Sequence, residues 1–324
     1  MMILSRRSGR RPFVCMASGI VVLCAALAAC SSRAPIDAPS GQPRIWDVRA
    51  ERFVSERQLV ADIAAARYRL LGEVHDNPAH HDIRARLIAA IADTGARPAV
   101  VLEQFDLDHD DALLGAQAAR TDAEQLVEAG KFDRNSWKWP LHKPIIEVAL
   151  ATRLLVRAGN VSRAQLRGDF QAEVVTNTDA IWYPRLRAAH WTESHAHMLR
   201  AEIIDSHCGQ LPEAIVPRLV LAQRVRDAAL AQALVSAATA DGAVLIAGNG
   251  HVRADIAVPV YLNVAGLPDA GGRSVSVGFI EVRPGDEHDG AFPGQLVADH
   301  PGFDYIWVTQ PVARDDPCER FSRQ

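Results

Sequence analysis

The sequence predicts an α/β fold in which a mostly parallel central sheet is flanked by helices, with an additional helical subdomain. Short apolar runs that end in polar residues alternate with amphipathic segments, which is the pattern of strand–helix–strand units. Hydrophobic residues make up 48% of the chain and aromatic residues 6%, and alanine is abundant, which favours helices over an all-β fold. We expect a single domain over residues 45–324, with a helical insertion around residues 108–212.

The first 29 residues have the pattern of a bacterial lipoprotein signal peptide. Four arginines form a basic start, and a short apolar segment then ends in Leu-Ala-Ala-Cys at Cys30. The apolar run is shorter than the ~20 residues that a spanning helix needs, and an ordinary secretory signal is the other alternative. Cleavage would leave Cys30 to carry the lipid, palmitate included. Residues 30–44, rich in Pro, Ser, Ala and Gly, would then form a flexible tether.

These features predict a protein held by lipid in the bacterial cell envelope, on the periplasmic side. Ser31 after the lipidated cysteine favours sorting to the outer membrane. Loss of residues 1–29 removes four arginines and no acidic residue, so the net charge changes from −4 to −8. Because nucleic acids are polyanions, an acidic protein is a poor candidate for binding them.

Two cysteines, Cys208 and Cys318, remain after the signal peptide and the lipidated cysteine are set aside. An even pair in an oxidising compartment suggests a disulfide, and two unrelated thiols are the alternative. The chain has no C-x-x-C-H motif for covalent haem attachment and no C-x-x-C pair for structural zinc.

The first half of the expected domain alternates strands and helices. An extended segment over residues 46–53 precedes a helix over residues 55–66, which begins with a serine cap. A buried strand over residues 68–74 leads into a helix over residues 78–93, which starts with Asn-Pro and carries isoleucines on one stripe. A second apolar strand over residues 98–105 completes a βαβ unit.

The remaining elements are predicted by the same periodicities, with glycine ending the longest helix. They are solvated helices over residues 108–130, an aromatic loop over 137–144, a helix over 145–157, a strand or extended segment over 160–166, helices over 170–212 and 212–240, and strands over 243–247, 275–282 and 304–308.

Polar residues follow three of these strands at the point where the apolar run stops. Glu73 and His75 follow the first strand, Glu103 ends the second, and His251 follows the third. Because the carboxyl ends of parallel strands lie side by side, we expect these four side chains to converge on one pocket.

Two carboxylates and two imidazoles can bind a metal ion, relay protons or hold a polar ligand. Zinc and manganese are divalent metals that accept such nitrogen and oxygen ligands. In a hydrolase, Glu73, His75, Glu103 and His251 would be both the catalytic residues and the metal ligands. The H-E-x-x-H motif of zincins is absent, and a hydrogen-bond network that only orders the loops is the alternative.

Two further segments carry candidate ligands. Arg226 could clamp a carboxylate or a propionate, although a surface ion pair with Asp227 is the simpler interpretation. Trp137 and Trp139 precede His142, and aromatic surfaces beside an imidazole suit a flat apolar ligand such as haem as well as a packed loop. The glycine-flanked turn before His251 lacks the third glycine of a dinucleotide site.

Four motifs together resemble the ChaN-type lipoproteins of the haem-binding uptake and Tiki-like superfamily, which also includes erythromycin esterases. The motifs are residues 72–81 (GEVHDNPAHH), 101–105 (VLEQF), 223–227 (QRVRD) and 247–253 (AGNGHVR). The resemblance implies a mostly parallel sheet flanked by helices and a role in iron uptake through haem binding across a dimer. For the wider superfamily it implies a hydrolytic site, which here would be Glu73, His75, Glu103, Arg226 and His251.

The sequence departs from the family where a tyrosine often follows the tryptophans, because His142 stands there. Both residue types can ligate haem iron. The candidate haem-binding residues are therefore His75, His142, Tyr183, Arg226 and His251.

We expect a lipid-anchored haem-binding protein of bacterial iron acquisition, with haem, a homodimeric copy and an outer-membrane haem or iron receptor as partners. The alternatives are a metal-dependent hydrolase and a non-catalytic envelope protein whose polar cleft is vestigial.

Overall fold

The computed structural model describes residues 44–267, 271–282, 292–315 and 318. These residues belong to one compact unit, Ile36–Gln324. The predicted signal peptide, the lipidation site at Cys30 and all but the last residue of the predicted tether lie outside the described residues. In the described part of the chain, none of the helices has the length and hydrophobicity that a transmembrane segment requires.

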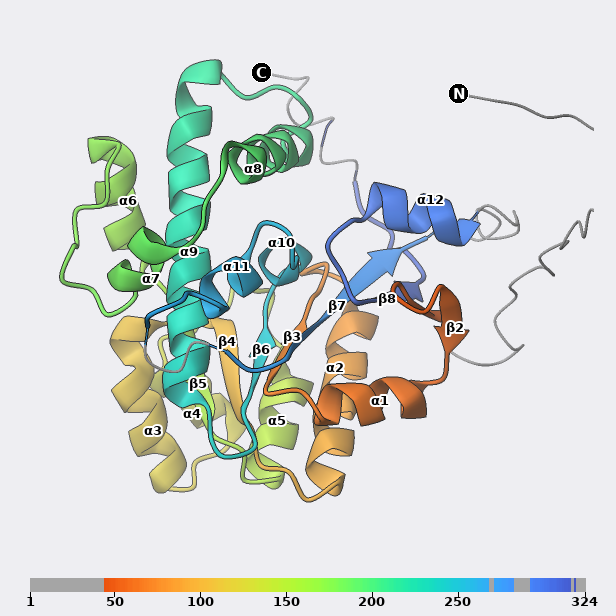
Figure 1. Cartoon of the computed structure of the whole chain (residues 1–324). Coiled ribbons are helices and arrows are strands. Elements are labelled where there is room, and N and C mark those ends of the chain that lie inside the picture. Colours follow the sequence, from red (N-terminus) through yellow and green to blue (C-terminus); the bar gives the residue numbers. More distant parts are fainter. Residues whose placement is uncertain (1–43, 268–270, 283–291, 316–317, 319–324) are drawn as a thin grey trace, which may run out of the picture. The chain divides into compact units, whose positions relative to one another are not determined.

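The described chain folds into a mixed α/β structure (Figure 1). The strands are β1 (Arg44–Asp47), β2 (Arg52–Val54), β3 (Tyr68–Leu71), β4 (Ala99–Asp106), β5 (Val156–Asn160), β6 (Ala243–Ile246), β7 (Ser274–Glu281) and β8 (Tyr305–Thr309). The α-helices are α1 (Glu56–Ala64), α2 (Pro78–Asp93), α3 (Asp110–Ala118), α4 (Ala123–Ala129), α5 (Lys143–Ala151), α6 (Arg163–Ala172), α7 (Tyr183–Ala188), α8 (Glu193–Ser206), α9 (Val216–Ala237), α10 (Asn249–Val252), α11 (Val258–Leu262) and α12 (Phe292–Asp299). Two short 3-10 helices are η1 (Leu107–His109) and η2 (Glu213–Ile215).

The eight strands form one sheet in the order β2-β1-β8-β7-β3-β6-β4-β5. Every pair from β8 to β5 is parallel, and only the β1–β2 hairpin and the β1–β8 pair are antiparallel. The predicted fold class, a mostly parallel sheet flanked by helices, is therefore confirmed. The two strands of the predicted βαβ unit, β3 and β4, are not direct neighbours, because β6 lies between them.

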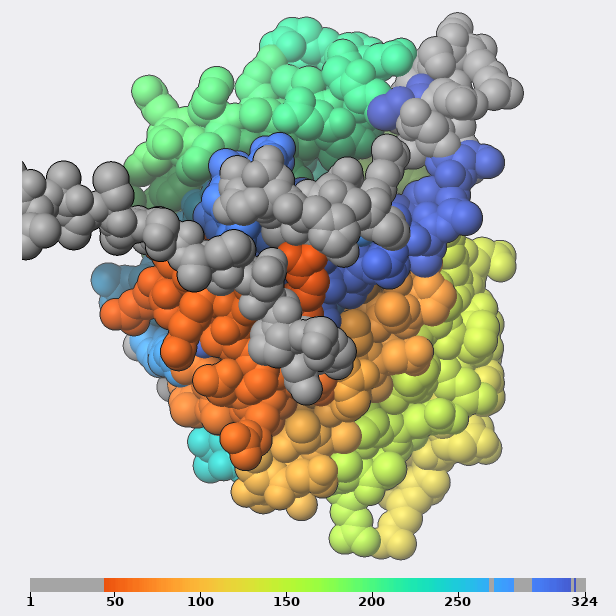
Figure 2. Space-filling model, turned by 90° about the vertical axis from the view of Figure 1, so that its right-hand side faces the viewer, coloured from red at the N-terminus to blue at the C-terminus, as the bar shows by residue number. Residues whose placement is uncertain are grey.

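The sheet is buried on both faces, which explains why its strands read as continuous apolar runs. Successive side chains point to opposite faces, so Val100 and Leu102 pack in one core cluster and Ala99 and Val101 in the other. Helices α1, α2 and α5 cover the first face and lie side by side in Figure 2. On the second face α9 packs on β4, β5 and β6, and α6, α7 and α8 pack against α9 (Figure 1).

One predicted helix is wrong in its second half. The helix expected over residues 145–157 ends at Ala151, Arg153 has a φ of 58°, and β5 begins at Val156. A short apolar run is compatible with the end of a helix and with a short buried strand. Periodicity alone therefore could not show where the helix ends and the edge strand begins. The segment expected as a helical insertion, residues 108–212, consequently contributes a strand to the sheet.

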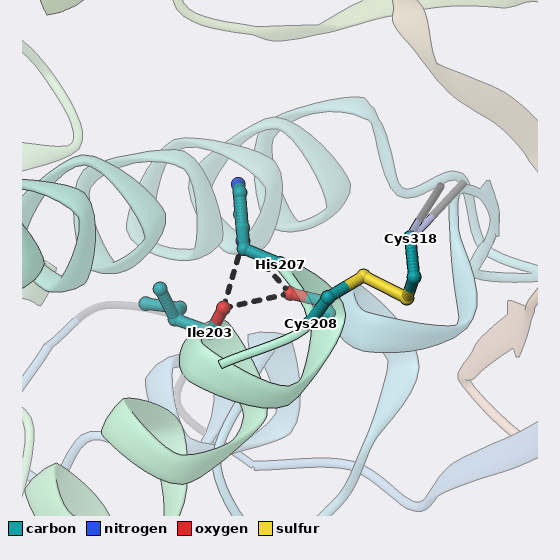
Figure 3. The surroundings of a disulfide bond; sticks show 5 residues. Ile203, His207, Cys208 and Cys318 are labelled. Atoms are coloured by element: carbon teal, nitrogen blue, oxygen red, sulfur yellow. Dashed lines mark hydrogen bonds between the residues drawn. A yellow bond between two sulfur atoms is a disulfide. The ribbon is translucent and has the colours of Figure 1, made fainter. Parts of the chain in front are cut away.

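A disulfide joins Cys208, just after α8, to Cys318 near the end of the chain (Figure 3). Cys208 has a left-handed backbone (φ 60°) in the turn that ends α8. In that turn the imidazole Nδ1 of His207 lies 2.7 Å from the carbonyl oxygen of Ile203. The bond ties two segments that are 110 residues apart in the sequence.

Candidate functional site

The carboxyl ends of β3, β6 and β4 meet at the centre of the sheet. Leu71, Ile246 and Leu102 lie at the same level of the parallel register. The polar residues that follow them are therefore neighbours. The backbone N–H of Asn249 donates to the carbonyl of Glu73 at 3.0 Å, which joins the loops after β3 and β6.

The first cluster of the site is built around Glu73, whose carboxylate is almost fully buried. One carboxylate oxygen, Oε1, accepts from Nδ1 of His75 at 2.6 Å and from the side-chain amide of Gln104 at 3.3 Å. The other oxygen, Oε2, contacts the guanidinium of Arg84 and lies 3.4 Å from Nδ1 of His81. A buried carboxylate is stable only with such compensation.

Two neighbouring histidines of α2 hold the loop that carries His75. The backbone N–H of Val74 donates to Nδ1 of His80 at 2.9 Å, and His80 Nε2 lies 2.7 Å from the hydroxyl of Thr309. Nε2 of His81 lies 3.1 Å from the carbonyl of His75. These histidines therefore have a structural role, because they fix the backbone on both sides of the exposed imidazole.

Burial determines the protonation of the inner histidines. Burial lowers the pKa of His81 and of His142 to about 3 and that of His80 to about 4, so all three are neutral at pH 7. Burial likewise lowers the pKa of Arg84 to about 9, and the guanidinium stays charged at that pH. Arg84 is thus the internal counter-charge of Glu73.

Glu73, His81 and His142 offer ligand atoms that all lie within 4.8 Å of one another, as a metal site would require. Carboxylate oxygen and imidazole nitrogen suit zinc or manganese. However, one guanidinium nitrogen of Arg84 contacts Glu73 and donates to His81 Nδ1 at 2.9 Å. Since arginine is protonated in proteins, its charge already stands where a divalent cation would bind, and the residues fit a metal poorly.

The second cluster is an ion network around His251. Nδ1 of His251 donates to Asp227 at 2.7 Å, and Nε2 lies 3.4 Å from Glu103. Burial alone would lower the pKa of His251, but the two carboxylates outweigh it and raise this pKa to about 10. Glu103 also accepts from the backbone N–H of Gly248 at 2.8 Å. His251 is therefore an imidazolium with both nitrogens engaged, and neither is free to ligate iron.

The expectation of a surface ion pair in the QRVRD motif is wrong. Asp227 has no exposed surface and is the partner of His251. Burial raises the pKa of Asp227 to about 6 even though His251 opposes that shift. Arg226 forms no ion pair with a described residue and lines a cavity beside Glu103 instead.

The exposed part of the site is the imidazole of His75, whose side chain is 48% exposed. Its ring packs edge-on against Trp137 with centroids 5.1 Å apart. Because Nδ1 is held by Glu73, Nε2 is the ring nitrogen left to contact a ligand. Gly248 leaves room at this nitrogen, since a Cβ there would come within 3.0 Å of Nε2.

The other proposed iron ligands are less accessible. His142 is fully buried, with its ring 4.4 Å from that of His81 and its Nε2 3.5 Å from Glu73 Oε1. A porphyrin could not reach it without displacing the surrounding chain. Tyr183 lies at the start of α7, where its ring neighbours are Trp182 and Arg187, and no contact joins it to the Glu73 cluster within the described ranges.

The structure thus brings Glu73, His75, Glu103 and His251 together, with His142 and Arg226 beside them, and leaves Tyr183 elsewhere. Sequence reasoning missed His81 and Arg84, and it misplaced Asp227. A signal for the first two was present, because both lie on the inner side of α2, among the isoleucines and leucine that mark its buried stripe. Polar residues on such a stripe need a buried partner.

The profile of the family described as haem-binding uptake, Tiki superfamily, ChaN matches residues 59–262. A solved structure described as cofacial heme binding to ChaN of Campylobacter jejuni shares 20% identity, with a TM-score of 0.67, over 84% of this chain and 98% of that chain. At this identity the likeness shows the fold.

A second solved structure, of the type III effector HopBA1, shares 12% identity over 86% of this chain and 100% of that chain. Its TM-score of 0.40 is too low to carry an inference. No curated protein sequence matches the chain.

Proposed function

The chain belongs to the family described as haem-binding uptake, Tiki superfamily, ChaN, and from this membership we propose that it is a lipid-anchored haem-binding protein of bacterial iron acquisition. The single observation that carries the proposal is the half-exposed His75 imidazole, whose inner nitrogen is fixed by the buried carboxylate of Glu73 at 2.6 Å. Haem iron takes an imidazole nitrogen as an axial ligand.

The residues around His75 fit such a ligand. Metal-binding histidines commonly donate their second ring N–H to a carboxylate, which fixes the ring orientation and makes the other nitrogen more basic. Glu73 provides this partner, and the guanidinium of Arg84 contacts the other oxygen of the same carboxyl group. Trp137 offers an aromatic surface against which a flat macrocycle can pack. When bound, haem supplies the iron, while this chain positions the imidazole and excludes water from its inner side.

The envelope part of the proposal rests on the sequence. The Leu-Ala-Ala-Cys segment would place a lipid on Cys30, and Ser31 favours the outer membrane. A homodimer and an outer-membrane haem or iron receptor are the partners that we propose for the uptake role. Labelling of cells with a palmitate analogue tests the anchor, because a Cys30→Ala variant should lose both the label and the membrane fraction.

Haem binding is tested by adding haem at micromolar concentration to the purified protein and recording the Soret band. We expect a saturable shift in the natural protein and in a His197→Ala control, since His197 lies exposed on α8. The His75→Ala variant should lose the spectrum of the imidazole-ligated iron. No shift in the natural protein would refute the proposal, and an unchanged spectrum in His75→Ala would refute the assigned ligand.

We do not propose the metal-dependent hydrolase. Its four expected ligands lie in two separate clusters, one neutralised by Arg84 and the other containing a protonated His251. Among the described residues, these four do not gather their ligand atoms around one point where a divalent ion could bind.

A further inference from the structure

A cavity of about 400 Å³ opens beside the Glu73 cluster, at the carboxyl ends of β4 and β5. Its walls carry charges of both signs. The acidic residues are Glu103, Asp106 and Asp133, and the basic residues are Lys131, Arg163 and Arg226. The cavity is joined to the exposed imidazole by two residues, because Trp137 packs on His75 and Gln104 donates to Glu73.

The acidic groups of the cavity are largely occupied within the protein. Glu103 is neutralised by His251 and accepts from a backbone N–H. Asp133 accepts from the hydroxyl and the backbone N–H of Ser136, at 2.7 and 3.0 Å, and lies 3.3 Å from Arg163. Burial raises the pKa of Asp106, which favours its neutral form relative to an exposed aspartate.

Arg226 is the group that the protein does not satisfy. Its Nε is buried and has no hydrogen-bond partner in the described part of the chain, and no carboxylate there lies within ion-pair distance of it. Burial lowers the pKa of Arg226. The negative charges of Glu103 and Asp227 act in the opposite direction, but neither carboxylate forms an ion pair with Arg226. Arg226 as a whole is only partly buried, but a buried donor such as its Nε that lacks a partner is unfavourable, and such orphaned groups commonly face a ligand or ion.

The start of α6 supplies further donors to the cavity wall. Ser162, Arg163 and Ala164 line it at the start of α6, a helix of ten residues. The first backbone N–H groups of a helix lack intrahelical acceptors and carry partial positive charge. The Ser162 hydroxyl accepts from the N–H of Gln165 at 3.3 Å, so its own hydrogen is available to a ligand.

We infer that this cavity is the carboxylate subsite of the haem pocket, in which Arg226 and the start of α6 bind one propionate of a haem seated on His75 and Trp137. The inference rests on the proposed haem binding and adds a site and a chemical group to it. Guanidinium binds carboxylate through paired N–H groups, and Arg226 lines the cavity with a guanidinium that forms no ion pair with a described residue. The nearby aspartates disfavour a second carboxylate in the same cavity.

The test compares haem with haem dimethyl ester, which has the same macrocycle and iron but no free carboxylate. Both are titrated in one detergent-containing buffer into the natural protein, Arg226→Gln and Arg120→Gln. The last variant is the matched control, because Arg120 lies beyond α3, in a groove it shares with Leu154 at the amino end of β5. Folding of each variant is checked by circular dichroism.

We expect the natural protein and Arg120→Gln to bind haem on the order of tenfold more tightly than the ester, since one charge-assisted contact is lost. Arg226→Gln should bind the two compounds equally. Equal affinity of the natural protein for both compounds would overturn the propionate site and leave haem binding intact. Preference for haem that persists in Arg226→Gln would overturn the role of Arg226. Failure to bind either compound would overturn the proposed function itself.

Discussion

The charge pair at the centre of the site gives the sharpest test of its energetics. Glu73→Gln keeps the shape of the side chain and removes its charge. The buried guanidinium of Arg84 would keep its hydrogen bonds to the carbonyl of His80, at 3.2 Å, and to Nδ1 of His81, at 2.9 Å, but it would face a neutral amide in place of the carboxylate. Arg84 itself has no exposed surface. The variant therefore leaves a fully buried cation without its carboxylate.

The expected loss of unfolding free energy follows from that burial. Breaking a buried ion pair by removing one partner costs about 3–5 kcal/mol. Removing both charges costs much less, so Glu73→Gln combined with Arg84→Met should recover about 2 kcal/mol or more of that loss. As a control, Glu56→Gln breaks the half-exposed pair with Arg86, which should cost less than about 1 kcal/mol.

The assay is urea unfolding of five proteins, followed by far-ultraviolet circular dichroism, with the slope of each transition compared. They are the natural protein, the single variants Glu73→Gln and Arg84→Met, the double variant and the Glu56→Gln control. A loss below about 1 kcal/mol for Glu73→Gln would refute the reasoning. So would strict additivity of the two substitutions, because it would mean that the two groups do not stabilise one another.

Three other outcomes follow from the same contacts. Gly248→Ala should weaken haem binding in a Soret titration, because its Cβ would lie 2.9 Å from the His75 ring; an unchanged dissociation constant would contradict this. Trp137→Ala should also weaken haem binding, through the lost aromatic surface, and equal affinity would count against that packing. Burial lowers the pKa of His142 to about 3, so its stabilisation, present above pH 6.5, is lost as pH falls towards 3. At pH 5 the loss is about 2 kcal/mol, and His142→Phe should flatten the decline in unfolding free energy between pH 7 and 5.

Much of the fold could be predicted because the core strands and helices satisfy local rules. The helix over residues 78–93 is observed with the predicted bounds, and its Asn77 side chain accepts from the N–H of Ala79 at 3.0 Å. Ser55 likewise caps α1 through a capping box. The strand or extended segment predicted over residues 160–166 is wrong in position, because β5 covers Val156–Asn160 and α6 begins at Arg163. The pairing of β5 with β4 is a tertiary contact that local periodicity does not report.

The site could be predicted only in outline. The meeting of Glu73, Glu103 and His251 could be predicted because each follows or ends a strand, and the carboxyl ends of parallel strands lie at the same edge of a sheet. The family membership expected from the four motifs is confirmed. The sequence could not show that Arg84 neutralises Glu73, because that pairing depends on how α2 faces the sheet. Nor could it show which of the histidines is exposed, because burial is set by segments distant in the chain.

His75, held by Glu73, would hold the iron of bound haem through its Nε2. Resonance Raman spectra of the ferrous haem complex test this ligation directly through the iron–histidine stretching band. We predict this band in the natural protein, a shift to lower frequency in Glu73→Gln, and its absence in His75→Ala. A band that is unaffected by His75→Ala, or an iron–tyrosinate signature in the ferric protein, would contradict the account.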